Sequence, residues 1–221
     1  MMRFILLLLF STHLMAQGDS IGVNQRTSGL FRVTTQDQEL KHYFDSKAKQ
    51  QLRAFRNGFF YGLTCEVYLM ALPEEISKWD RDNMFSLPHL VDHYRETFSN
   101  PPVIDHDVWY VNYLGHPYQG AFYYNSIRSQ GGTVLASSVN AFLQTIIWEY
   151  LWEGGRERPS IQDLTVTPLS GIVLGELSHK ASMAMARNGY SFPEKVLVTL
   201  IDPSFLLNGN FKTARHLRPN L

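Results

Sequence analysis

Side chains that could do chemistry recur at a spacing of four in three segments of the second half of the chain. The rows are Asn112, His116, Gly120, Tyr124 and Arg128; Ser137, Ala141, Thr145, Glu149 and Glu153; and Asp163, Thr167, Gly171, Gly175 and His179. Residues four apart in an α-helix share a face, although such a row drifts by about 40° at each step. The spacing therefore predicts three helices with polar stripes, and about three members of each stripe can meet in one place.

The charged members of these rows are costly to bury alone, but a core tolerates them when they are paired and hydrogen-bonded. Arg128 can hold one carboxylate through a bidentate fork. His116 could act as a general base or a metal ligand, with a carboxylate of Glu149, Glu153 or Asp163 as its partner, as an acid or as a second ligand. We interpret these five residues first as a structural network that fixes helix register, and second as a catalytic or ligand-binding site.

Small residues within the same rows predict close contact between the helices. Gly171 and Gly175 form a pair at the spacing that lets another backbone approach closely, and Gly120 can do the same on the first helix. The polar groups would lie between these close contacts.

A weaker candidate for metal binding is the pair His89 and His93, whose spacing of four on a helix can chelate an ion. The sequence assigns no third ligand to this pair. The chain contains no H-E-x-x-H, G-x-S-x-G, Walker or Rossmann motif, so the cofactor is left unknown.

Helical periodicity and stop signals predict an all-α fold, a compact bundle of about five to six helices with glycine-mediated close packing. The expected helices span about 45–72, 88–98, 107–128 (or 117–128), 133–153, 160–188 and 193–201. Glycine pairs at 131–132 and 154–155 are helix stop signals, and Ser160 with Asp163 resembles a capping box. The polar side chains in the 133–153 segment favour a bundle that rests on a membrane or partly enters it over a simple spanning protein.

The first sixteen residues, MMRFILLLLFSTHLMA, have the order of a secretory signal peptide. Arg3 precedes an apolar run that is shorter than the roughly 20 residues of a membrane-spanning helix, and the small residue Ala16 ends the segment. We expect cleavage before Gln17. Export predicts a place in the periplasm or at the outer membrane of a bacterial cell envelope.

The mature chain is expected to form one domain. The predicted organisation is a signal peptide at 1–16, a flexible lead-in at 17–38, a single helical domain at 39–207, and an irregular tail at 208–221. The single cysteine excludes an internal disulfide.

The charge balance excludes one class of partner. The chain has 20 basic and 20 acidic residues, and loss of the first sixteen removes one base, Arg3, and no acid. A chain so close to neutral lacks the positive charge of a nucleic-acid-binding protein. A membrane or an envelope protein is the possible partner, and the oligomeric state is open.

Two runs resemble a known family. The segments DHDVWYVNYLGHPYQGAFYYNSIRSQGG (105–132) and WEYLWEGGRERPSIQDLTVTPLSGIVLGE (148–176) closely resemble the bacterial domain-of-unknown-function family DUF3943. The resemblance implies an exported envelope protein of unknown activity.

A more distant resemblance is to VanZ-like and YfiM-type envelope proteins. These also place a His-bearing helix first, then a helix with a Glu near its end, then a Ser/Asp-led helix with spaced glycines. The matching positions here would be His116, Glu149 and 160–163, followed by Gly171 and Gly175. This likeness implies a shared bundle and no particular reaction.

The sequence leaves two functions open. The first is a non-catalytic, membrane-associated helical protein that binds lipid or a partner through segment 193–201 and the apolar end of the 45–72 helix. The second is a hydrolase of an envelope ester, amide or phosphate bond, with His116 as base and Glu149, Glu153 or Asp163 as its partner, either with or without a divalent metal ion.

Overall fold

A computed structural model of the chain describes residues 47–104, 106–209 and 211. The expected signal peptide at 1–16, the lead-in at 17–38 and most of the tail at 208–221 lie outside these residues. Across the described part the fold is helical, with an isolated bridge between Val103 and Ser160 and no strand. The predicted all-α class and the number of main helices, about six, are confirmed.

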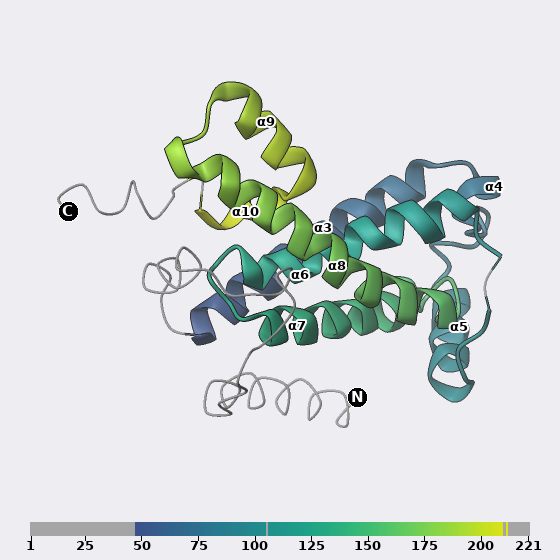
Figure 1. Ribbon diagram of the computed structural model, residues 1–221. Coiled ribbons are helices and arrows are strands. Elements are labelled where there is room, and N and C mark those ends of the chain that lie inside the picture. The colour runs from purple at the N-terminus through teal and green to yellow at the C-terminus, as the bar shows by residue number, and fades with distance from the viewer. Residues whose placement is uncertain (1–46, 105, 210, 212–221) are drawn as a thin grey trace.

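The elements follow one another closely along the chain (Figure 1). They are α3 (Lys47–Ala71), α4 (Glu74–Ser77), α5 (Leu87–Ser99), the π-helical turn η2 (Val111–Gly115), α6 (His116–Arg128), α7 (Val134–Ile147), the π-helical turn η3 (Trp148–Trp152), α8 (Ile161–Met185), the 3-10 turn η4 (Ala186–Asn188), α9 (Phe192–Ile201) and α10 (Pro203–Gly209).

Local capping explains where several helices begin. The Thr133 hydroxyl accepts the Ala136 N–H at 3.1 Å at the start of α7, and the Ser160 hydroxyl accepts the Asp163 N–H at 3.1 Å at the start of α8. The cap expected at Ser160 is therefore present. The last helix expected from the sequence ends at residue 201, so α10 is an addition. Pro203 follows that helix as a stop signal would, but proline is also well suited to the first turn of a helix.

Helix α6 is the centre of the bundle, with α3, α7, α8 and α10 packed against it. In Figure 1, α9 and α10 lie at one end of the bundle and α5 lies at the other. Every residue of α6 from Gln119 to Arg128 is buried. The side chains on the other helices that can reach α6 therefore decide what the core contains.

The crossing of α6 and α8 is a backbone contact. A methyl group on Gly171 would lie 2.5 Å from the Gly120 Cα, and one on Gly120 would lie 3.0 Å from the Gly171 Cα. The first distance is too short for a real side chain and the second is at the limit, and a methyl group on Gly120 would also overlap the Thr167 carbonyl oxygen. The expected role of these glycines in close packing is therefore confirmed, and the Tyr124 ring covers Gly175 in the same way.

The helices around α6 turn polar side chains inward and apolar ones outward. On α7 the buried residues are Ser137, Asn140, Ala141, Gln144 and Thr145, whereas Leu135 and Phe142 are exposed. On α8, Asp163, Thr167 and Glu176 are buried, whereas Leu169, Val173 and Leu177 are exposed. Among the residues that the structure describes, no helix is long and apolar enough to cross a membrane.

Adding one methyl group at the crossing tests how tightly it is packed. We expect Gly171→Ala to lower the free energy of unfolding by about 1–3 kcal/mol, because the backbones would have to separate. Gly115→Ala is the matched control: its backbone is helical, with φ −64°, and the nearest atom to the added methyl is 3.9 Å away. This control should gain up to about 1 kcal/mol. Equal denaturation midpoints for the two variants would contradict the contact.

Candidate functional site

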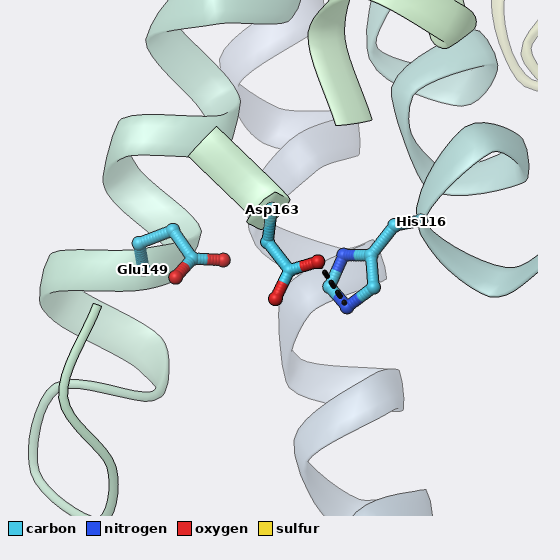
Figure 2. A group of neighbouring side chains, drawn as sticks. All are labelled: His116, Glu149 and Asp163. Carbon is cyan, nitrogen blue, oxygen red and sulfur yellow. Dashed lines mark ion pairs between the residues drawn. The ribbon is translucent and has the colours of Figure 1, made fainter. Parts of the chain in front are cut away.

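His116, Glu149 and Asp163 meet at the interface of three helical elements. His116 is the first residue of α6, Glu149 lies in η3, and Asp163 lies in the first turn of α8. All three are buried, and one ligand-type atom from each lies within 4.8 Å of the others. Figure 2 shows Asp163 between the other two, with its Oδ1 3.5 Å from Nε2 of His116. We call these three residues the His–Glu–Asp cluster.

Neighbouring groups fix the orientation of the cluster. Nδ1 of His116 lies 3.1 Å from the Thr167 hydroxyl, so Nε2 is the imidazole nitrogen that faces Asp163. The Ser160 N–H donates to Oε2 of Glu149 at 2.8 Å. Ser160 thus holds Glu149 through its amide while its hydroxyl caps the turn that carries Asp163.

Two π-helical turns help to place these residues. Turn η2 ends directly before His116, and η3 contains Glu149. A π-helical turn contains more residues than an α-helical turn and therefore changes which residues face the core; such turns occur often at functional sites. After Ile147, therefore, residues four apart no longer share one face as they do in the regular helix α7.

Glu153, the next member of the second row, is near the cluster but only partly buried. Burial raises the pKa of its carboxyl well above the usual value, and repulsion from Glu149, Glu157 and Asp163 raises it further. The neutral, protonated form of Glu153 is thus favoured beside the other carboxylates.

Arg128, the last of the five candidates, forms its ion pair with Glu176. Its Nε and Nη2 donate to the two Glu176 oxygens at 2.8 and 3.2 Å, and both side chains are fully buried. Tyr124 adds a hydrogen bond to Glu176 at 2.7 Å. The structure therefore brings His116, Glu149 and Asp163 together, places Glu153 beside them, and joins Arg128 to a carboxylate outside the three rows.

Glu176 was missed because it does not continue any spacing-of-four row. One signal could have found it: Glu176 is a single acid within the apolar stretch IVLGEL, and it directly follows Gly175. Burial also keeps the Tyr124 hydroxyl protonated, since it raises the pKa of that group far above its usual value.

His89 and His93 lie together on α5, with ring centroids 4.4 Å apart. Burial lowers the pKa of His93, and the neighbouring His89 lowers it further. Within the described part of the chain, the His–Glu–Asp cluster is the one set of three or more His, Cys, Asp or Glu residues close enough to share a metal ion. No third ligand among those residues joins the histidine pair.

Comparison with known families identifies the segment that carries these features. Residues 101–204 match the family described as Domain of unknown function (DUF3943), which confirms the resemblance seen in the sequence. No curated protein and no solved structure matches the chain. The matched segment, residues 101–204, contains both the His–Glu–Asp cluster and the Arg128–Glu176 pair.

The Arg128–Glu176 pair allows a test of buried charge against exposed charge. We expect Glu176→Gln to lower the free energy of unfolding by about 3–5 kcal/mol, because the Arg128 charge stays buried without its counter-charge. Asp92→Asn is the control, since Asp92 and Arg95 form an exposed pair at 2.8 Å that contributes about 0–1 kcal/mol. Denaturant titration gives both values, and similar losses would show that the buried pair contributes no more than a surface one.

Proposed function

We propose that this protein is an exported, membrane-associated helical protein of the bacterial cell envelope, with a structural or interaction role rather than a catalytic one. One observation carries the proposal. Among the described residues, buried polar side chains outnumber buried hydrophobic ones by nearly two to one, while many large apolar side chains are exposed. The interior of a water-soluble globular protein is mainly apolar, so many buried polar groups are unusual. Large exposed apolar patches usually mark surfaces that contact a membrane or another protein.

The outward apolar faces lie on several sides of the bundle. They occur on α3, α7, α8 and α9, and α3, α7 and α8 each pack directly against the central α6. A protein partner would cover one patch, whereas a lipid phase can contact all of these faces. Lipid is therefore the contact that this distribution favours.

Both surfaces expected from the sequence carry exposed apolar side chains. On α9, Leu197 is 47% exposed and Leu200 is 63% exposed; on the second half of α3, Phe60 and Val67 are 58% and 59% exposed. These exposed fractions support segment 193–201 and the end of the first helix as contact surfaces.

Aromatic residues near η2 support the same role. Trp109, Tyr110, Tyr113 and Tyr118 are all exposed, and the Tyr118 hydroxyl donates to the Leu200 carbonyl at 2.9 Å. That bond places the start of α6 beside the apolar face of α9. Tryptophan and tyrosine are enriched where proteins meet the boundary between water and lipid.

Vesicle flotation of the processed protein tests the proposal. We expect it to float with neutral phosphatidylcholine vesicles. The double variant Leu197→Ser/Leu200→Ser should bind at least about 10-fold more weakly, because burial of a leucine side chain in lipid contributes up to about 1.5–3 kcal/mol that a serine does not. Lys195→Ser on the same helix is the control and should bind like the wild type. The proposal would be refuted if all of the wild-type protein were recovered in the soluble fraction, bound neither to vesicles nor to a partner protein.

The His–Glu–Asp cluster favours a second candidate function. An imidazole and two carboxylates from separate elements could hydrolyse an envelope ester, amide or phosphate bond, with His116 as base and Glu149, Glu153 or Asp163 as its partner.

Hydrolysis and stability measured on His116→Ala and Glu149→Gln separate the two candidates. For the structural role we expect no hydrolysis of chromogenic acetate or phosphate esters by the wild type, and a lower free energy of unfolding in both variants. Hydrolysis by the wild type that both variants lose, with their stability unchanged, would instead establish the second function.

A further inference from the structure

We propose that His116, Glu149 and Asp163 bind one divalent transition-metal ion, of the kind represented by Zn²⁺. The proposal is independent of membrane association, because the cluster lies inside the bundle rather than on its apolar faces. It rests on three features: the distances within the cluster, the chemistry of its donor atoms, and the groups that orient them.

The distances fit a shared ion better than a direct bond. Nε2 of His116 and Oδ1 of Asp163 are 3.5 Å apart, whereas a charge-assisted N–H···O bond is about 2.7–2.9 Å long. Two ligand atoms that each lie about 2.1 Å from a tetrahedral ion are about 3.4 Å apart. The third ligand lies within 4.8 Å of the other two, so adjustments of about 1 Å complete the site.

The donor set selects the type of ion. Imidazole nitrogen is a common ligand of zinc and of neighbouring divalent transition ions, and zinc also accepts carboxylate oxygens. Ca²⁺ and Mg²⁺ prefer oxygen ligands alone and more of them. An imidazole in the set therefore favours Zn²⁺ over both.

Two of the three ligands, His116 and Glu149, are held by a second group, as metal ligands in proteins generally are. The Thr167 hydroxyl lies where it can accept the Nδ1 proton of His116, and that tautomer leaves the lone pair of Nε2 directed toward Asp163. The Ser160 amide donates to Oε2 of Glu149 and so fixes the orientation of its carboxylate. Because α6 and α8 meet at Gly120 and Gly171, the elements that carry His116 and Asp163 are fixed relative to each other.

Metal content of the full processed chain is the first measurement. The protein is stripped with a chelator, then titrated with Zn²⁺ by calorimetry, and we expect one equivalent to bind. X-ray absorption at the zinc edge should show nitrogen and oxygen ligands that include a single imidazole and no sulfur. Less than stoichiometric binding, two imidazoles or a sulfur ligand would overturn the proposal, and this measurement needs no variant to fold.

Conservative variants then assign the ligands. Glu149→Gln and Asp163→Asn should each weaken Zn²⁺ binding by at least about 100-fold, and Thr167→Val, which removes only the hydroxyl that orients His116, by about 10–100-fold. Asp92→Asn is the control for a carboxylate outside the cluster, and His89→Ala/His93→Ala is the control for the other histidine cluster. Both controls should bind one Zn²⁺ like the wild type. Loss of the ion in the histidine double variant, or its retention in Asp163→Asn, would overturn the assignment.

Discussion

The contact between the α6 and α8 backbones at Gly120 and Gly171 is the constraint on which the rest of this structure depends. With no side chain between them, the two helices approach closely enough for short and medium side chains on either side of the crossing to meet. On one side are His116 and Asp163; on the other, Tyr124 lies over Gly175 and Arg128 reaches Glu176. A wider separation would leave all of these buried polar groups without their present neighbours.

The two polar clusters differ in kind. Arg128 and Glu176 balance each other in charge, and their geometry is that of a short bidentate pair, so this cluster suits the fixing of register. The His–Glu–Asp cluster combines one imidazole with two carboxylates, and Nε2 of His116 lies 3.5 Å from Oδ1 of Asp163, which is longer than a normal hydrogen bond. Its side chains are of the kinds that bind metal ions in proteins. One domain therefore holds a satisfied structural pair next to a set of ligand-type groups.

Much of this arrangement follows from sequence patterns, and the exceptions have physical causes. Spacing of four placed His116 and Asp163 on the right helix faces, and Ser160 marked the start of α8, because both are properties of a single helix. The partner of Arg128 depends on where two helices cross, which no spacing within one helix encodes, so Glu176 was missed. The π-helical turn at 148–152 rotates the residues after it relative to the face of α7. Glu153 is therefore less buried than a regular row at a spacing of four implied.

The inward polar faces of α7 and α8 have a consequence for how the chain is stabilised. Collapse in water draws its free energy mainly from the burial of apolar surface, and here much of that surface faces outward in the finished fold. Hydrogen bonds and ion pairs between helices must supply a larger share, and these interactions strengthen as the surrounding dielectric constant falls. A medium of lower polarity than water would therefore strengthen the interactions that join the helices of this bundle.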